Sequence, residues 1–180
     1  MEKSIEIQAS DVQGQPGHEE IESFHDKFKR LFGLRPVDVR AYSPLTLAYL
    51  GDAVFEVLIR SLIVERSNAP VNKLHKRSST LVKASAQAAL VKAVEPRLSE
   101  EELSVYKRGR NAKSYTMAKH ATMTDYRMAT GLEALVGYLY LKQDYDRILE
   151  LIRFGLETMG EIPSKNTGTA EHGSSKKEEK

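Results

Sequence analysis

One apolar stretch with an acid in its middle decides how this chain folds. It reads Leu45-Thr46-Leu47-Ala48-Tyr49-Leu50-Gly51-Asp52-Ala53-Val54-Phe55-Glu56-Val57-Leu58-Ile59. Because the stretch is apolar nearly all round, it predicts a helix at the centre of the fold. Ser43-Pro44 before it is a helix start, since serine can cap and proline forfeits no hydrogen bond at the first helical position. Asn68-Ala69-Pro70 stops this helix, which we expect to cover residues 44–66.

The other segments with regular apolar spacing also have the period of helices. Further helices are expected at about 18–32, 71–94, 99–106, 125–142 and 145–159, with proline and glycine between them. Ser99 with Glu102 resembles a capping box, and Asp144 can cap the last helix. Residues 110–124 are polar, basic and without clear period, which is typical of a loop of functional length. The predicted fold class is all-α.

Length and composition restrict the kind of protein. The 180 residues, 41% of them hydrophobic, favour one main domain with its own core. We expect an N-terminal extension with one amphipathic helix over 1–40, a main domain over 41–159 and a disordered tail over 160–180. The absence of cysteine excludes disulfides, cysteine-ligated zinc and thiol catalysis. No uncharged run reaches the roughly 18 residues of a membrane span and no signal peptide is present, so we expect a cytoplasmic protein without a membrane partner.

Two carboxylates lie in settings that do not suit a charge. Asp52 is in the middle of the apolar stretch, and Glu133 is inside a second one, Gly131-Leu132-Glu133-Ala134-Leu135-Val136-Gly137-Tyr138-Leu139. A buried, ionised carboxylate is unfavourable unless it is paired, hydrogen-bonded or bound to a metal. Glycine inside a helix indicates close approach of another backbone. If the two helices touch at Gly51 and the glycines around Glu133, Asp52 and Glu133 come together.

Adjacent carboxylates repel one another unless a cation lies between them. Oxygen ligands with open water positions suit Mg²⁺, with Mn²⁺ as a substitute. The sequence leaves an alternative open, in which the acids are neutralised by Arg60, Arg127 or Lys142. Glu56, one helical turn after Asp52, could join the metal site or pair with a nearby arginine.

Basic residues gather in two places. One cluster falls between Glu102 and Asp125 with no acid inside it, and polar side chains are interleaved with its lysines and arginines. Such a field of cations and hydrogen-bond donors suits a phosphate backbone. The second cluster, around Lys76 and Arg77, taken alone fits a solvated helix face better than a binding surface. The candidate RNA-binding residues are Lys76, Arg77, Lys107, Arg108, Arg110, Asn111, Lys113 and Ser114.

Several of these stretches resemble one protein family. Tyr49-Leu50-Gly51-Asp52-Ala53-Val54-Phe55-Glu56 resembles the signature of the ribonuclease III catalytic domain, and Leu132 to Leu141 resembles its second acidic motif. Leu74-His75-Lys76-Arg77-Ser78-Ser79 and Lys107-Arg108-Gly109-Arg110-Asn111-Ala112-Lys113-Ser114 are similar to Mini-ribonuclease III, the short bacterial branch. The resemblance covers about residues 45–154.

The resemblance implies both an architecture and an activity. It implies a ribonuclease III endonuclease-domain-like helical bundle over 41–159 that forms a homodimer. It implies metal-dependent hydrolysis of double-stranded RNA, with Asp52 and Glu133 as the catalytic and metal-binding residues. The short branch implies maturation of the large-subunit (23S) ribosomal RNA precursor.

The sequence also departs from the longer enzymes of the family. They have a further Glu where this chain has Ala48 and a further Asp where it has Thr130, so Asp52 and Glu133 must hold more of the metal, with water or Thr130 filling in. The short branch lacks the separate double-stranded-RNA-binding domain, so we expect phosphate contacts from the catalytic domain itself.

Two alternatives belong to other functional classes. The small number of metal-binding carboxylates is compatible with a non-catalytic RNA-binding protein that keeps the ribonuclease III fold. A helical protein-interaction adaptor is the third possibility, and it predicts no salt-sensitive RNA binding.

Overall fold

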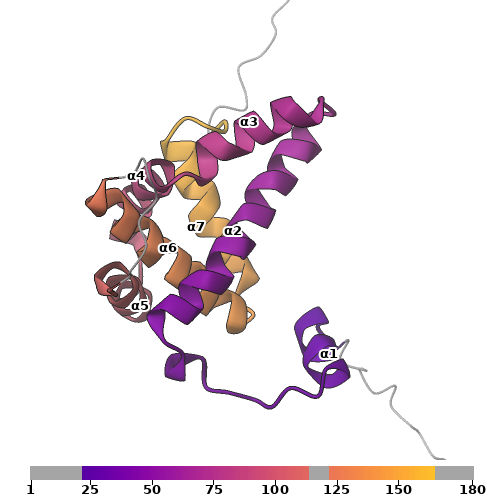
Figure 1. The fold of residues 1–180 in the computed structure, drawn as a ribbon, viewed down its shortest axis with the longest axis vertical. Coiled ribbons are helices and arrows are strands. Elements are labelled where there is room, and N and C mark those ends of the chain that lie inside the picture. Colours follow the sequence, from indigo (N-terminus) through magenta and orange to yellow (C-terminus); the bar gives the residue numbers. More distant parts are fainter. Residues whose placement is uncertain (1–21, 114–121, 165–180) are drawn as a thin grey trace, which may run out of the picture. The chain divides into compact units, whose positions relative to one another are not determined.

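The computed structural model describes residues 22–113 and 122–164 (Figure 1). The chain divides into two compact units, Met1–Pro36 and Val37–Lys180. The first unit holds α1 (Phe24–Leu31), which is shorter than the helix predicted at 18–32. Ser23 has extended backbone and its hydroxyl accepts a hydrogen bond from the Asp26 N–H, so the helix begins after it. Residues 1–21 and 165–180, which include parts of the expected extension and tail, lie outside the described residues.

The second unit is built from helices alone in its described residues, which confirms the all-α prediction. In chain order it contains η1 (Val39–Ala41), α2 (Pro44–Arg66), α3 (Val71–Val82), α4 (Ala84–Val94), η2 (Glu95–Arg97), α5 (Glu100–Asn111), α6 (Met123–Leu141) and α7 (Tyr145–Thr158). Three predicted helix starts are confirmed: Ser43 caps α2, Ser99 and Glu102 form a capping box on α5, and Asp144 caps α7. None of the helices in the described ranges has the length and apolar character of a membrane span.

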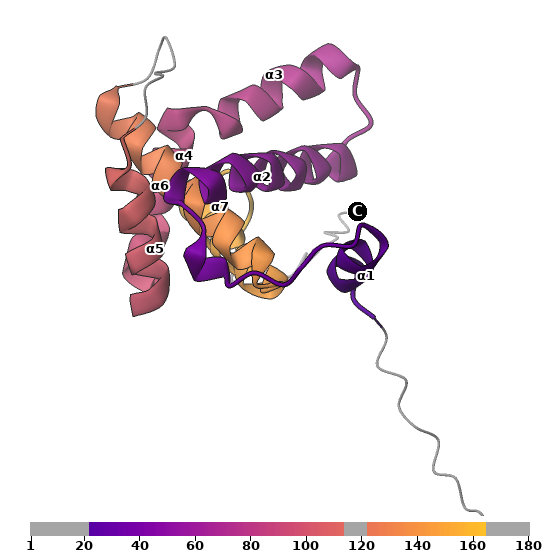
Figure 2. The same cartoon turned by 60° about the horizontal axis from the view of Figure 1, so that its bottom comes forward.

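The core lies around α6, which packs against α2, α4, α5 and α7. Every residue of α6 from 128 to 139 is buried except Glu133, which is only partly buried. The longest helix, α2, crosses α6, and α3 folds back beside α2 (Figures 1 and 2). Phe55 and Ile59 of α2, with Leu90 of α4, contribute fully buried side chains to this core.

The prediction of a single helix at 71–94 is wrong, because the helix is interrupted at Lys83. Lys83 has φ −65° and ψ 150°, an extended conformation that separates α3 from α4. The Lys83 carbonyl starts α4 by accepting hydrogen bonds from the Ala86 and Gln87 N–H groups at 2.9 and 3.1 Å. The Val82 carbonyl instead accepts a hydrogen bond from the Gln87 side chain at 3.1 Å. A side-chain donor thus compensates for the backbone bond that the break removes.

The prediction that the helix starting at Ser99 ends at about residue 106, before Gly109, is also wrong. Helix α5 continues to Asn111, and α6 begins at Met123 with Thr122 as its cap. Gly109 is buried, and a Cβ there would lie 2.6 Å from the Cβ of Ala134. This glycine therefore serves close helix packing rather than helix termination. Of the predicted loop at 110–124, residues 110 and 111 belong to α5 and residues 123 and 124 to α6, and residues 114–121 lie outside the described part.

Candidate active site

Helices α2 and α6 touch backbone to backbone at glycines. A Cβ on Gly51 would collide with the carbonyl oxygen of Glu133 and lie 2.6 Å from the Gly137 nitrogen. A Cβ on Gly137 would collide with the carbonyl oxygen of Leu47. The predicted close approach of the two helices is confirmed, and it brings Asp52, the residue after Gly51, beside Glu133.

Asp52 is less buried than the sequence predicted. Helix α2 buries one stripe against its neighbours, namely Leu47, Ala48, Gly51, Phe55, Ile59 and Ile63. Asp52 lies at the edge of this stripe and is exposed, whereas Glu133 is partly buried. The expectation of two acids embedded among apolar side chains is therefore wrong for Asp52. Because α2 is covered on one side only, the acid next to Gly51 faces the solvent while staying next to α6.

Burial and a nearby negative charge raise the pKa of each carboxyl. Burial, followed by the negative charge of Asp52, raises the pKa of Glu133 to about 7. Loss of solvent around Asp52, followed by the charge of Glu56, raises the pKa of that carboxyl as well. A site that disfavours two negative charges in this way favours a bound cation, since a cation would remove the repulsion.

The side chains that could have neutralised these acids are placed elsewhere. Arg60 pairs with Glu56 at 2.7 Å, and Lys142 pairs with Glu101 at 3.0 Å. Within residues 22–113 and 122–164, no ion pair joins Arg60, Arg127 or Lys142 to Asp52 or Glu133. The sequence left Glu56 either to join the metal site or to pair with an arginine, and in the structure it pairs with Arg60.

The donors that remain fit a hydrated divalent ion. The described residues contain no group of three or more histidine or acidic side chains that could hold a metal. Ala48 offers no ligand, and the Thr130 hydroxyl donates to the Tyr126 carbonyl at 3.1 Å. Two carboxylates with most positions left to water match the preference of Mg²⁺. The buried Oε1 of Gln87 has no hydrogen-bond partner in the described part of the chain, and the Gln87 amide lies near Glu133, whose pKa it lowers.

The candidate RNA-binding residues from Lys107 to Asn111 are helical. Lys107, Arg108, Arg110 and Asn111 lie on the last turns of α5, where cations are favourable near the carboxyl end of the helix dipole. Lys113 follows the helix and is exposed, and Ser114 lies outside the described residues. Lys107, Arg108 and Asn111 line an open hollow of about 450 Å³. The guanidinium of Arg110 lies 5.6 Å from the centre of the Tyr106 ring.

Gly109 sets this basic end of α5 against the part of α6 that carries Glu133. A Cβ at Gly109 would meet Ala134, Gly131 and Thr130 of α6, which flank Glu133 along the chain. The cations on either side of Gly109 therefore project from a segment that touches the neighbours of Glu133.

The second predicted cluster lies elsewhere in the fold. Lys76 and Arg77 are exposed on α3, and Arg77 is 3.9 Å from Glu161. Helices α3 and α5 lie apart in both views of the fold (Figures 1 and 2). The structure thus separates the candidate RNA-binding residues into two surfaces.

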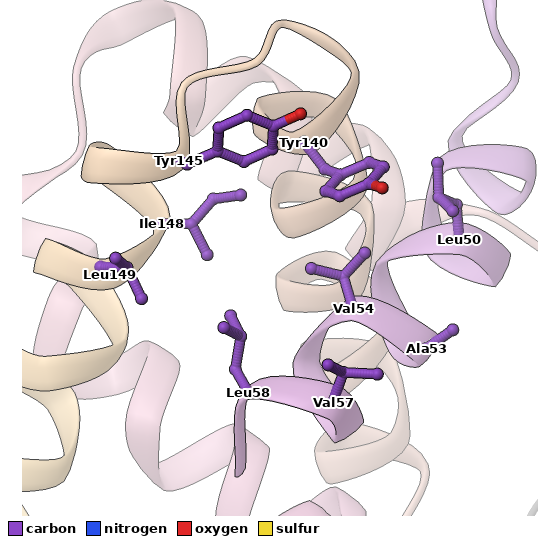
Figure 3. A pocket seen from close by; sticks show the side chains of 9 residues that line it. All are labelled: Leu50, Ala53, Val54, Val57, Leu58, Tyr140, Tyr145, Ile148 and Leu149. Carbon is purple, nitrogen blue, oxygen red and sulfur yellow. The ribbon is translucent and has the colours of Figure 1, made fainter. Parts of the chain in front are cut away.

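Sequence reasoning missed an apolar pocket between α2, α6 and α7 (Figure 3). Its volume is about 380 Å³, and it is lined by Leu50, Ala53, Val54, Val57, Leu58, Tyr140, Tyr145, Ile148 and Leu149. The α2 side chains face those of Tyr140 from α6 and of Tyr145, Ile148 and Leu149 from α7 across the pocket. The sequence did contain a signal for this pocket. Apolar residues surround the whole of α2, whereas α6 covers only one side of that helix.

Sequence reasoning also missed Gln87. This amide is 1% exposed and stands among the buried Ala86, Ala88, Leu90 and Val91 of α4. A polar side chain within an alanine-rich helix was a signal available in the sequence, because a buried amide requires partners.

Known proteins share this fold and these motifs. The Ribonuclease III domain model matches residues 45–144. The Mini-ribonuclease 3 of Clostridium tetani is 46% identical over 138 residues, which make up 76% of this chain and 90% of that protein. The Mini-ribonuclease 3 of Enterococcus faecalis is 45% identical over 130 residues, 71% of this chain and 98% of that protein. The crystal structure of Protein FN1578 from Fusobacterium nucleatum matches 70% of this chain and 97% of that chain, with 31% identity and a TM-score of 0.63.

The chain therefore belongs to the ribonuclease III family, and it is an endoribonuclease of that family. Enzymes of this family are generally metal-dependent and act on double-stranded RNA. The resemblance to its Mini-ribonuclease III branch, predicted from the motifs, is confirmed.

Proposed function

We propose that this protein hydrolyses double-stranded RNA with Mg²⁺ held by Asp52 and Glu133, and that its catalytic domain spans residues 41–159. The observation that carries the proposal is the carboxylate pair at the α2–α6 glycine contact, where no cationic side chain in the described ranges pairs with either acid. We further propose that Mn²⁺ substitutes for Mg²⁺.

The chain's own residues hold the ion and the RNA. A bound Mg²⁺ supplies an activated water and stabilises the negative charge that develops on the phosphate. Asp52 faces the solvent, where it can meet both the ion and a substrate, and Glu133 anchors the site from the partly buried side. Neither carboxylate forms a covalent bond to RNA in this scheme.

The RNA lies on the basic end of α5 in this proposal. Lys107, Arg108, Arg110 and Asn111, followed by Lys113 and Ser114, supply phosphate contacts next to the carboxylates. Double-stranded RNA is recognised by shape, phosphates and 2′-hydroxyls, so this surface needs no contact to base edges. Lys76 and Arg77 on α3 are proposed to contact a more distant part of the duplex, because they lie on a separate surface.

A second copy of the chain is the proposed partner for the apolar face of α2. Tyr49, Ala53 and Val57 form an exposed stripe with the four-residue spacing of one helix face, and Val57 also lines the apolar pocket. Exposed apolar surface of this kind marks an interaction site. A two-fold homodimer would bury it against itself and provide two carboxylate pairs for the two strands of one duplex.

The proposed substrate in the cell is the 23S ribosomal RNA precursor, cut in the cytoplasm. The similarity to proteins named Mini-ribonuclease 3 supports this choice through the family resemblance of the motifs.

A cleavage assay with purified protein tests the proposal. The wild type is incubated with double-stranded RNA in Mg²⁺ and in EDTA, beside Asp52→Asn and the control Glu56→Gln, whose side chain is paired with Arg60. We expect cutting by the wild type and by Glu56→Gln in Mg²⁺ only, and none by Asp52→Asn. Salt-sensitive RNA binding without cutting in Mg²⁺ or Mn²⁺ would instead support the non-catalytic RNA-binding protein.

A further inference from the structure

Gln87 is a buried amide whose hydrogen bonds are only partly satisfied. It lies on α4 and is 1% exposed. Its Nε2 donates to the Val82 carbonyl at 3.1 Å, while its Oε1 has no partner in the described part of the chain. Buried polar side-chain atoms almost always have a partner, and leaving one without is unfavourable by about 1–3 kcal/mol. An orphaned acceptor at this depth therefore indicates a functional requirement.

The hydrogen bond to the Val82 carbonyl fixes the Gln87 side chain at the break between α3 and α4. In an uninterrupted helix the Val82 carbonyl would accept from the Ala86 N–H. Here the Ala86 N–H donates to the Lys83 carbonyl at 2.9 Å, which leaves the Val82 carbonyl to the Gln87 amide. The amide group is thus held at a defined place by the end of α3.

The Gln87 amide also lies near the Glu133 carboxyl. Burial and the charge of Asp52 raise the pKa of the Glu133 carboxyl, and the neighbouring Gln87 amide lowers it. An amide nitrogen carries two protons, so one can serve Val82 and the other Glu133. Helices α4 and α6 pack directly against each other, which places the two side chains within reach.

We propose that Gln87 is a positioning residue of the metal centre: its amide nitrogen orients the Glu133 carboxylate, and its free Oε1 accepts a hydrogen bond from the water that surrounds the bound ion. The proposal rests on the proposed function, because it assumes that Asp52 and Glu133 hold a divalent ion. It fits a site with few protein ligands, where the orientation of each ligand matters more. Partners that orient metal ligands affect affinity strongly in other proteins.

The test measures Mn²⁺ binding to the full chain without RNA, by the loss of the free-ion electron paramagnetic resonance signal. Gln87→Met keeps the size of the side chain and removes both donors and the acceptor. We expect it to weaken Mn²⁺ binding about tenfold or more relative to the wild type. The matched control is Ser78→Ala, which removes a buried side-chain hydrogen bond on α3, from the Ser78 hydroxyl to the His75 carbonyl. Ser78→Ala should bind Mn²⁺ like the wild type.

Thermal melting in EDTA separates an effect on folding from an effect on metal binding. The melting temperature of Gln87→Met should not lie much below that of Ser78→Ala. Nuclear magnetic resonance of the wild type gives a second test that does not depend on any variant. The side-chain amide signal of Gln87 should shift when Mg²⁺ is added, and that of the exposed Asn72 should not.

The outcomes distinguish the two proposals. If the wild type binds no Mn²⁺, or if Asp52→Asn binds it with unchanged affinity, the proposed metal centre is refuted. If the wild type binds Mn²⁺ through Asp52 but Gln87→Met binds equally well, or the Gln87 amide signal does not respond to Mg²⁺, only the role of Gln87 is overturned.

Discussion

Gly51 of α2 lies so close to the carbonyl oxygen of Glu133 on α6 that no side chain fits between them. This contact fixes the distance between the two helices at the point where each carries a carboxylate. The candidate active site therefore depends on a residue that has no functional group of its own.

Replacing Gly51 with alanine should destabilise the fold and disturb the site together. The added methyl group would overlap the Glu133 carbonyl, so α2 and α6 must move apart. We expect the free energy of unfolding to fall by about 1–3 kcal/mol, as for other overpacked cores. Urea unfolding followed by circular dichroism measures this. Ser61→Ala, at an exposed position of the same helix, is the control, and equal stability of both variants would contradict this expectation.

Removing either carboxylate should abolish cleavage without abolishing RNA binding. Asp52→Asn and Glu133→Gln each lose one ligand for the ion, and we expect the rate of RNA cleavage in Mg²⁺ to fall by about a thousandfold. RNA affinity in a gel-shift assay should change little, because the cations of α5 remain. Near-normal cleavage by Glu133→Gln would show that the site lies elsewhere.

The stability of the metal-free protein should fall as the pH rises. Glu133 has a pKa of about 7 in the folded chain and an ordinary value of 4.5, so the folded state holds its proton more tightly. This contribution is fully present below pH 4.5 and is lost as the pH rises toward 7. In EDTA at pH 8, Glu133→Gln should therefore be more stable than the wild type, by on the order of 2 kcal/mol. Thermal melts of both proteins at pH 5 and pH 8 measure the difference, which Mg²⁺ should reduce at pH 8.

The basic end of α5 should carry a measurable share of RNA binding. We expect the double variant Lys107→Ala with Arg108→Ala to weaken binding roughly tenfold and to lower the salt slope by about one for every phosphate that is no longer neutralised. Lys92→Ala, an exposed lysine on α4, is the matched control. Affinities measured over a series of salt concentrations give both quantities, and an unchanged slope in the double variant would exclude this surface.

A charge on the exposed stripe of α2 should prevent dimer formation. Val57 is 62% exposed and lines the apolar pocket, so Val57→Glu would place a carboxylate inside the proposed interface. Sedimentation should give a dimer for the wild type and a monomer for Val57→Glu. Val64→Glu, at a 56% exposed position of the same helix outside that pocket, should remain a dimer. A monomeric wild type would contradict the proposed assembly.

The sequence by itself determined the features that neighbouring residues encode. The all-α class, the bounds of α2 and the caps at Ser43, Ser99 and Asp144 follow from local periodicity and capping chemistry. The glycines beside Asp52 and Glu133 also predicted that α2 and α6 touch, since glycine inside a helix has little other reason to be there. The catalytic and metal-binding roles of the two acids stay a prediction.

Only the tertiary structure decided which side of each helix is covered. It left Asp52 exposed and continued α5 past Gly109. It also interrupted the helix at Lys83 and brought Gln87 near Glu133. The physical reason is that burial and side-chain partners come from residues distant in the chain. Gln87 on α4 and Glu133 on α6 are separated along the chain by the whole of α5, so no local pattern could predict that they meet.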